Sequence, residues 1–454
     1  MQNYHDLDRY QDILGQLPML QVYSHILYLF PMPEGVSKEQ IVHKLETVVT
    51  KVREEVPWMG ARVINVGSKP GDSGLYKVIS VPRPENIIDV RDLSNVLPTY
   101  AEFKERKVPV SQIDPDLLTP VPGFPEKAID SDENPAHVVR LQVSFVQGGL
   151  IIDFCIEHNM ADAGGHFGLV GLIAMTMRGE EFPKPLLEQI NLDRRNLFAL
   201  LGPDEPTLDH SHHKRPSITA SDPLARPEPA RYHILRFTAD KLAKLKDMAS
   251  QPEGFDSDVP FISTDDALSA FLWQRLTMVR SQRFPPETRS RLSRAIDGRK
   301  ALQIPPGYMG DVIHNVTTFM TFGEITGSPL STVASRLRKR LNECNTTYHV
   351  RSFATFVARE PDKSTITYTG QFNPETDIGC SSVRGRASHL FPDFGVLGRP
   401  DFIRRPPSVP FRSVLVFIPG NLDGDCDASV CLADSDLASL EQDPVWNEHV
   451  EYIG

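Results

Sequence analysis

Residues 137–165 read HVVRLQVSFVQGGLIIDFCIEHNMADAGG and carry the clearest structural signals in the chain. Two runs rich in β-branched and aromatic residues stand on either side of Gln-Gly-Gly at 147–149, which predicts a β-hairpin. The second run ends at His158, and an apolar segment typical of a helix resumes after Asp162. We interpret the glycine pair 164–165 as room for a sharp turn between them. His158 is therefore expected in a strand-to-helix connection, where a rigid sheet commonly presents functional groups.

His158 and Asp162 admit two interpretations. The imidazole, with an ordinary pKa of about 6.5, could remove a proton near neutral pH. Alternatively, His158 is a hydrogen-bonded structural histidine beside a helix-capping aspartate. Side chains alternate in direction along a strand, so Cys155 is expected to point away from the face that Ile156 shares with His158, and it is a poor cysteine partner for that histidine. These residues alone leave both interpretations open.

Both halves of the 454-residue chain mix helix and strand patterns. In the first half, residues 36–56 place apolar side chains at helical spacing, with Ser37 as the expected N-cap. In the second half, residues 232–249 pass from a strand pattern to a helix pattern, and a helix over 263–280 opens at Ser263 or Thr264. The predicted fold class is α/β, with mixed α+β sheets in two layers.

The length of the chain favours two domains, because it exceeds the usual size of a single hydrophobic core. Between Phe182 and Tyr232 there are eight prolines, a composition poor in helix and strand periodicity. We predict an N-terminal domain over 1–195, an exposed crossover linker over 196–230 and a C-terminal domain over 231–454. The histidine-rich stretch 209–213 lacks ordered metal-ligand spacing and is interpreted as a solvated loop.

Composition excludes several classes of function. The net charge of -11 argues against a nucleic-acid partner. The N-terminus lacks the pattern of a signal peptide, and the apolar run FGLVGLIAMTM is too short to cross a membrane. Five cysteines, an odd number, fit a reducing compartment with no disulfide framework, so we expect a cytoplasmic protein. We also expect a monomer with no membrane partner. Motifs of P-loop enzymes, common serine hydrolases and zinc metalloproteases are absent from the sequence.

Three further motifs follow HNMAD at 158–162 in a fixed order. They are AIDGR at 295–299, PPGYMGD at 305–311 and DFGVLGRPDFIRRP at 393–406. Together the four resemble the BAHD acyltransferases, whose signatures are H-x-x-x-D, D-x-R, a Y-F-G-N-like element and D-F-G-W-G. The resemblance is closer to the fungal branch that trichothecene 3-O-acetyltransferase represents, and it covers nearly the whole chain. It extends to LGQLPML at 14–20, VPWMGARV at 56–63, NLDRR at 191–195 and STDDALSAFLW at 263–273.

The resemblance implies two domains of the chloramphenicol-acetyltransferase type, with the active site in a channel between them. It implies that His158 is the general base, which takes a proton from an acceptor hydroxyl that attacks an acyl-CoA thioester. It also implies that Asp162 turns away from the substrate, orients the loop and pairs with Arg299. By the same match, Ser381 is a donor to the tetrahedral oxyanion. The residues expected to be structural are Arg299, Asp297, Asp393 and Gly395.

The implied reaction uses acetyl-CoA or another acyl-CoA as cosubstrate, with no tightly bound cofactor and no metal. The acceptor is a small-molecule alcohol, a hydrophobic fungal secondary metabolite. CoA carries phosphates, so cationic and capping groups are expected near the channel. The candidates are Ser263, Thr264, Arg294 and Lys300, with Arg299, Arg404 and Arg405 as further cations.

The sequence departs from the family pattern at three positions. The tryptophan of D-F-G-W-G is absent, Asp311 replaces the usual asparagine of the Y-F-G-N element, and Val383 replaces a tryptophan after Ser381. Two alternatives to an acyl-CoA enzyme are a non-catalytic binding protein of the same fold and an acyltransferase with a carrier-protein-bound donor. Condensation domains, which use such donors, usually have histidine and glycine where this chain has Glu157 and Ala163, so free acyl-CoA is favoured.

Overall fold

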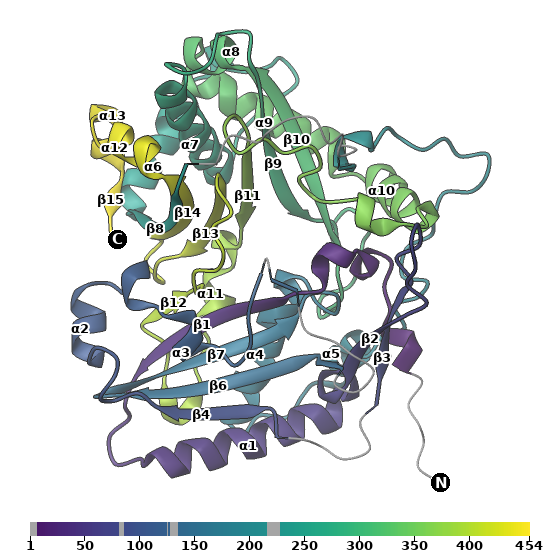
Figure 1. Ribbon diagram of the computed structural model, residues 1–454, viewed down its shortest axis with the longest axis vertical. Helices are drawn as coiled ribbons and strands as arrows, with labels where there is room; N and C mark the ends of the chain where they lie inside the picture. The colour runs from purple at the N-terminus through teal and green to yellow at the C-terminus, as the bar shows by residue number, and fades with distance from the viewer. Residues whose placement is uncertain (1–6, 81–85, 125, 128–134, 216–227) are drawn as a thin grey trace.

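The computed structural model describes residues 7–80, 86–124, 126–127, 135–215 and 228–454. Two β-sheets, one above the other in Figure 1, form the two lobes of the molecule. Each sheet has its own hydrophobic core. The predicted α/β class with mixed sheets is confirmed.

The first sheet has five strands in the order β12-β1-β7-β6-β4. Its strands are β1 (Tyr23–Pro31), β4 (Ile88–Asp92), β6 (Val139–Val146), β7 (Gly149–Glu157) and β12 (Phe402–Arg404). Helices α1 (Lys38–Glu55) and α4 (Ala163–Met177) pack on one face, and α2 (Tyr100–Glu105) and α3 (Pro115–Leu118) contribute to the cluster on the other. Every residue of β7 is buried, because this central strand is covered on both faces. A small sheet beside it contains β2 (Arg62–Val66), β3 (Leu75–Ile79) and β5 (Ala136–His137).

The second sheet has seven strands in the order β10-β9-β11-β13-β14-β8-β15. Its strands are β8 (Ala230–Phe237), β9 (Arg289–Asp297), β10 (Ile313–Thr321), β11 (Ile378–Ser382), β13 (Val414–Pro419), β14 (Cys426–Ala433) and β15 (Glu451–Tyr452). Helices α6 (Ala239–Ala249), α7 (Thr264–Arg280) and α9 (Leu330–Cys344) share its core. The other helices are α5 (Lys184–Ile190), α8 (Phe322–Gly327), α10 (Thr347–Arg359), α11 (Ala387–Leu390), α12 (Asp434–Leu440) and α13 (Pro444–His449).

Several local predictions are confirmed. The hairpin forms from β6 and β7, which pair antiparallel from Val139 opposite Ile156 to Val146 opposite Gly149. Helix α1 begins after Ser37, whose side chain accepts from the Gln40 N–H in a capping box. Ser263, rather than Thr264, caps α7.

One strand from the second half of the chain, β12, belongs to the first sheet. After β11 the chain returns to the first sheet, where β12 pairs antiparallel with β1, placing Arg404 opposite Leu27. Without β12, strand β1 would be an exposed edge, and edge strands are usually covered in native proteins. The predicted domain boundaries at residues 195 and 230 follow from composition. A strand of three residues is too short to change the composition, so the return of β12 to the first sheet could not be predicted.

The predicted solvated loop at residues 209–213 is wrong. His210 and His213 are each only 1% exposed, because this stretch packs against α10. The His210 ring lies edge-on to Phe353, and its Nε2 is 3.0 Å from Ser352 Oγ. The second part of the predicted linker, 216–227, lies outside the described residues.

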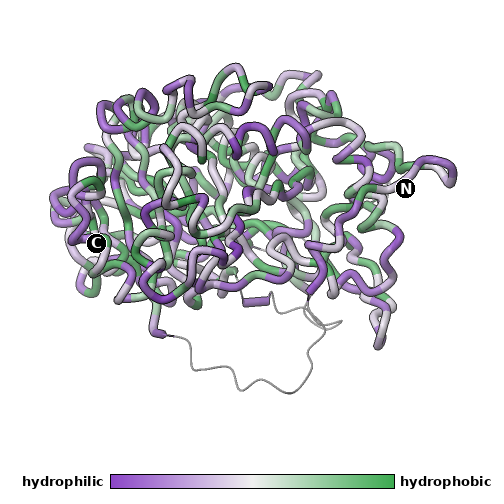
Figure 2. The backbone as a smooth tube through the Cα atoms, turned by 90° about the horizontal axis from the view of Figure 1, so that it is seen from above, coloured by the Kyte–Doolittle hydropathy of each residue, from purple (hydrophilic) through white to green (hydrophobic). Residues whose placement is uncertain are grey.

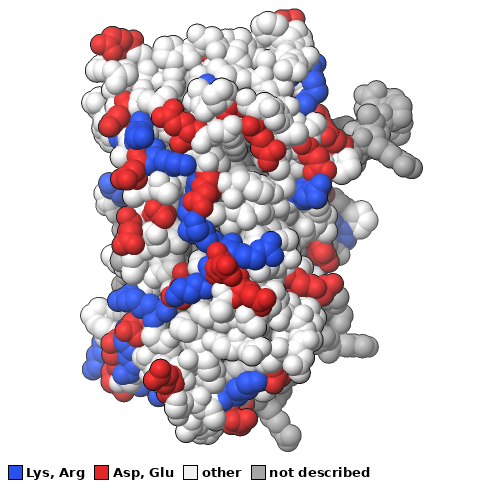
Figure 3. All heavy atoms as spheres, turned by 90° about the vertical axis from the view of Figure 1, so that its left-hand side faces the viewer, with Lys and Arg blue, Asp and Glu red and all other residues white. Residues whose placement is uncertain are grey.

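The surface carries no large single-sign field on the face that Figure 3 shows, where Lys and Arg lie interspersed with Asp and Glu. Seen from above in Figure 2, many hydrophilic stretches lie along the outline of the molecule. Among the helices in the described ranges, none is both long and apolar enough to span a membrane.

Candidate active site

His158 follows β7 directly and lines a cavity of about 270 Å³. Its backbone N–H donates to the Val22 carbonyl (2.8 Å), which ties it to the chain leading into β1. Both lobes contribute to the wall of this cavity. The first supplies His158, Ala163 and Gly164, and the second supplies residues of β9, β10, β11, β13 and β14.

Asp162 is the N-cap of α4 and is fully engaged by its neighbours. Its two carboxylate oxygens each accept from the Arg299 guanidinium at 2.8 Å, in a bidentate pair between the two lobes. They also accept from the backbone N–H groups of Gly165 and Val312, both at 3.1 Å. Burial disfavours the charged carboxylate, but Arg299 and these donors together hold the pKa of Asp162 below its ordinary value. Asp162 therefore fixes the position of the loop and has no oxygen left to act on a substrate.

The glycines after Asp162 have a different role from the predicted one. Gly164 and Gly165 lie in the first turn of α4, not in a sharp turn before it. A Cβ atom at Gly165 would lie 2.0 Å from the Met309 carbonyl oxygen, and one at Gly164 would lie 3.1 Å from Arg299 Nη1. Their missing side chains let the segment that carries Arg299 approach the helix.

Asp297 orients Arg299. Its Oδ1 accepts from the backbone N–H of Arg299 (3.0 Å) and from Nη1 (3.1 Å). The same guanidinium donates to the carbonyls of Tyr308 (3.2 Å) and Gly310 (2.8 Å). The D-x-R and Y-F-G-N-like elements thus form one hydrogen-bonded unit around the Asp162 carboxylate.

His158 itself is partly open to the cavity, with 24% of its side chain exposed. Its Nδ1 lies 3.7 Å from Oδ2 of Asp311. Burial lowers the pKa of His158 and outweighs the opposing effects of its own backbone and of Asp162, and the positive charge of Arg405 adds a smaller lowering. At neutral pH the imidazole is therefore neutral, which is the form that accepts a proton.

Ser381 lies on β11 and lines the same cavity as His158. The neighbouring Ser382 donates its hydroxyl to Asp265 Oδ2 (3.1 Å). The structure thus brings the candidate base and the candidate oxyanion donor to the wall of one cavity, from opposite lobes.

The candidates for CoA binding lie elsewhere. Ser263 accepts from the Asp266 N–H (3.1 Å) as a helix cap, and the Arg294 guanidinium donates to Asp266 (2.7 Å) and to the Leu337 carbonyl (2.6 Å). Neither residue lines the cavity, and the same holds for Thr264 and the exposed Lys300. The CoA-binding role of these four residues stays a prediction.

Arg405 is one of several cations that the sequence offered for CoA binding, and it is the one that lies at the cavity. It lines the cavity of His158 and also a second cavity of about 500 Å³, and the two share Phe124, Pro406 and Ser408 as further wall residues. The adjacent Arg404 is buried and donates to Asp427 (2.9 Å). Arg405, by contrast, makes no hydrogen bond or ion pair within the part of the chain that the structure describes.

The D-F-G element lies away from both cavities. Asp393 Oδ1 accepts from the Gly395 N–H (2.8 Å), and Gly395 adopts a positive φ of 65°, which favours glycine. Phe394 is buried against Phe154 and Tyr28 in the core of the first sheet. Asp393 and Gly395 thus shape a turn that fastens this segment to the first lobe.

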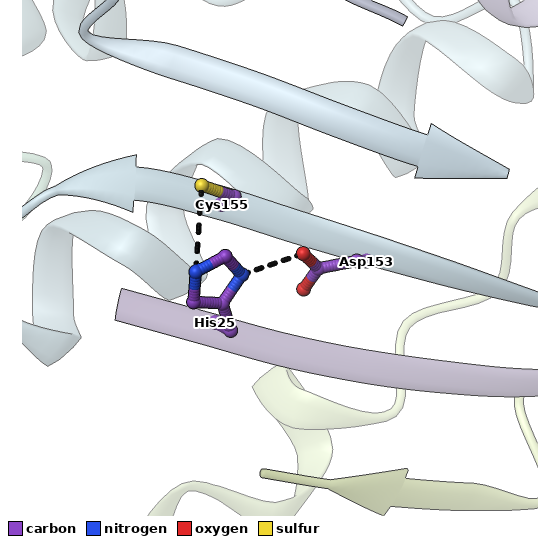
Figure 4. A group of neighbouring side chains, drawn as sticks. All are labelled: His25, Asp153 and Cys155. Carbon is purple, nitrogen blue, oxygen red and sulfur yellow. Dashed lines mark hydrogen bonds and ion pairs between the residues drawn. The ribbon is translucent and has the colours of Figure 1, made fainter. Parts of the chain in front are cut away.

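Figure 4 shows a second group of polar side chains, on β1 and β7. His25, Asp153 and Cys155 are the one set in the described ranges whose ligand atoms lie close enough to hold a metal ion. Asp153 Oδ2 lies 2.6 Å from Nδ1 of His25, whereas Cys155 Sγ lies 4.0 Å from Nε2. The two partners therefore face opposite nitrogens of one ring, an arrangement typical of a hydrogen-bonded chain and not of ligands around one ion. Cys155 does have a histidine partner, but it is His25.

Comparison with known proteins gives a consistent assignment. The model of a trichothecene 3-O-acetyltransferase-like N-terminal domain matches residues 22–176, and the model of the Transferase family matches residues 121–446. The chain is 57% identical to the O-acetyltransferase epaC of Aspergillus niger, over 99% of this chain and 98% of that protein. It is 43% identical to the O-acyltransferase pigD of Monascus ruber, over 99% and 100% of the two chains.

The fold matches a solved structure across its whole length. The crystal structure of TRI101 from F. graminearum, complexed with coenzyme A and deoxynivalenol, superimposes with a TM-score of 0.89. The match has 29% sequence identity and covers 98% of this chain and 99% of that one. On these grounds the chain belongs to the BAHD transferase family, in the branch with a trichothecene 3-O-acetyltransferase-like N-terminal domain, and it is an acyltransferase.

Proposed function

We propose that the protein transfers an acetyl group from acetyl-CoA to a hydroxyl group of a hydrophobic fungal secondary metabolite. The observation that carries this proposal is the neutral, partly exposed imidazole of His158 in a cavity walled by both lobes. Support comes from relatives named as O-acetyltransferases and from the coenzyme A in the TRI101 complex. A monomeric state and a cytoplasmic location stay predictions.

In the proposed mechanism His158 acts as a general base. The ring nitrogen that faces away from Asp311 takes the proton of the acceptor hydroxyl as its oxygen attacks the thioester carbonyl. The Ser381 hydroxyl, with nearby backbone N–H groups, donates to the tetrahedral oxyanion. When the intermediate collapses, the C–S bond breaks and protonated His158 returns its proton to the CoA thiolate.

Arg405 is the residue to which we assign electrostatic binding of the donor. A partly buried guanidinium without a carboxylate is costly, so an anionic ligand group would stabilise it. The phosphates of CoA are such groups, and the two adjoining cavities that share Arg405 provide room for an elongated donor.

The acceptor is best identified by product analysis. Purified protein is incubated with acetyl-CoA and a panel of terpenoid, polyketide and alkaloid alcohols, and products are measured by mass spectrometry. We expect one class to gain an acetyl group, with CoA thiol released in equal amount in a thiol-reagent assay. Absence of any acetylated product together with absence of CoA release would favour the non-catalytic alternative. Acetylation only from a carrier-protein thioester would favour the other one.

A further inference from the structure

Asp311 is the acidic residue that faces His158. The 3.7 Å between its Oδ2 and the histidine Nδ1 separates two buried polar atoms, neither of which has a hydrogen bond to the described residues. The rest of Asp311 is held firmly, because Oδ1 accepts from the Ile313 N–H (2.9 Å) and its own N–H donates to Asp12 Oδ2 (3.0 Å). Its free oxygen therefore stays directed at His158.

Asp162 is not available as a carboxylate partner of His158. Arg299, Gly165 and Val312 already donate to its two oxygens. The aspartate of the H-x-x-x-D motif thus fixes the loop and is not free to pair with His158. Asp311 stands where the family pattern has an uncharged asparagine.

A carboxyl at this position is expensive to bury. Asp311 is fully buried, and the nearby carboxylates of Asp162 and Asp12 add repulsion, so its pKa lies well above the ordinary value despite a weaker opposing effect of Arg299. Asp12 has its own cation, since Arg194 Nη1 lies 3.8 Å from it. Within the described residues no lysine or arginine forms an ion pair with Asp311. The imidazolium that forms during the reaction is the cation placed to meet it.

We propose that Asp311 is a positioning residue that holds the Nδ1–H of His158 and stabilises the imidazolium formed in the transition state. This inference rests on the proposed function of His158. The acceptor proton goes to Nε2, the proton on Nδ1 stays on the ring and is shared with the Asp311 carboxylate, and the Nε2 proton leaves with the CoA thiol. The 3.7 Å separation fits this role, because catalytic hydrogen bonds are often long in ligand-free enzymes and tighten on substrate binding.

The two groups are expected to titrate as a pair. The form competent for catalysis has the Nδ1–H directed at ionised Asp311 and a free Nε2, and adding one proton to the pair inactivates it. The other charged and titratable groups that act on the pair are Asp12, Asp162, His166, Arg299, Arg405 and Tyr368. Without the Asp311 charge, His158 would hold a proton less tightly, so the acid limb of the pH profile would move to lower pH.

The test is Asp311→Asn, a nearly isosteric change that installs the usual residue of the family. We expect kcat to fall roughly 10- to 10³-fold with KM changed by no more than about twofold, as for other lost partners of a catalytic histidine. The acid limb of kcat/KM should move to lower pH. Asp377→Asn is the matched control, because Asp377 is also buried but pairs with Arg291 (2.7 Å) in the second lobe. That variant should lose stability and keep the wild-type pH profile.

A second measurement does not depend on whether the variant folds. The ¹⁵N NMR spectrum of the wild-type protein, with the His158 signals assigned by their loss in His158→Ala, should show Nδ1 protonated at neutral pH. A proton on Nε2 instead, or a wild-type rate and pH profile in Asp311→Asn, would overturn the role of Asp311. Neither result would affect the proposed function, which fails if His158→Ala retains normal activity or if the wild-type protein gives neither an acetylated product nor CoA release.

Discussion

One histidine–aspartate pair lies within the first lobe and a second joins the two lobes, and their histidines behave in opposite ways. His25 and Asp153 touch at 2.6 Å, and the contact raises the pKa of His25 well above its ordinary value although burial opposes this. His158 and Asp311 are 3.7 Å apart, and burial lowers the pKa of His158. The difference teaches that a carboxylate strongly stabilises a buried imidazolium in the resting protein only when the two groups are in contact.

The two pairs also differ in access. His25 is 3% exposed, and its two ring nitrogens face Asp153 and Cys155, so both are occupied (Figure 4). His158 has one nitrogen directed at Asp311 and keeps a partly open side chain in the cavity. The first pair suits a permanent structural contact, and the second suits a base that gains its partner during the reaction.

Removing the imidazole of the His158–Asp311 pair should have the largest effect. We expect His158→Ala to lower kcat/KM roughly 10²- to 10⁴-fold, the usual contribution of general acid–base catalysis. The melting temperature should stay near the wild-type value, because the side chain is partly exposed and makes no hydrogen bond to the described residues through Nδ1. Steady-state kinetics and thermal melting check this, and near-normal turnover would refute the assignment of the base.

Breaking the His25–Asp153 pair should instead lower the stability of the fold. His25→Ala leaves the fully buried carboxylate of Asp153 without its cation, and loss of one partner of a buried pair typically costs about 3–5 kcal/mol. We expect a lower free energy of unfolding in urea, with kcat/KM reduced much less than in His158→Ala, because His25 lines the second cavity but both its ring nitrogens are occupied. The double variant His25→Ala/Asp153→Asn should recover part of the loss. If His25→Ala abolished turnover and kept full stability, the structural role of this pair would be wrong.

The sequence predicted the local elements because each depends on a short-range pattern. The hairpin before His158 and the capping box at Ser37 follow from residues a few positions apart. The pairing of Asp162 with Arg299, 137 residues later, came only from the family resemblance and is present in the structure. No local spacing could have indicated it.

The remaining features depend on which segments meet in space. Asp311 was visible as a departure from the family pattern, but its place opposite His158 depends on how the segment before β10 folds over α4. Arg294 and Arg405 cannot be distinguished by sequence pattern. Only the structure shows that Arg294 forms an ion pair with Asp266. The polar stretch at 209–213 resembles a loop in composition, yet aromatic residues of α10 bury its histidines.

His210 extends the comparison to a buried histidine that no carboxylate contacts, and there the smallest of these effects is expected. Burial, with the neighbouring His212, lowers the pKa of His210 to about 4. The folded protein therefore binds this proton less readily than the unfolded chain, whose histidine has a pKa of about 6.5, so stability is complete above pH 6.5 and falls as the pH drops toward 4. We expect His210→Gln to lessen the loss of unfolding free energy between pH 7 and pH 5 by about 1–2 kcal/mol.

Urea unfolding at both pH values measures this difference. His43→Gln, on the exposed face of α1, is the control that should follow wild type. An equal loss in wild type and His210→Gln would show that this histidine is not held neutral, and that burial without a contacting carboxylate does not set its protonation.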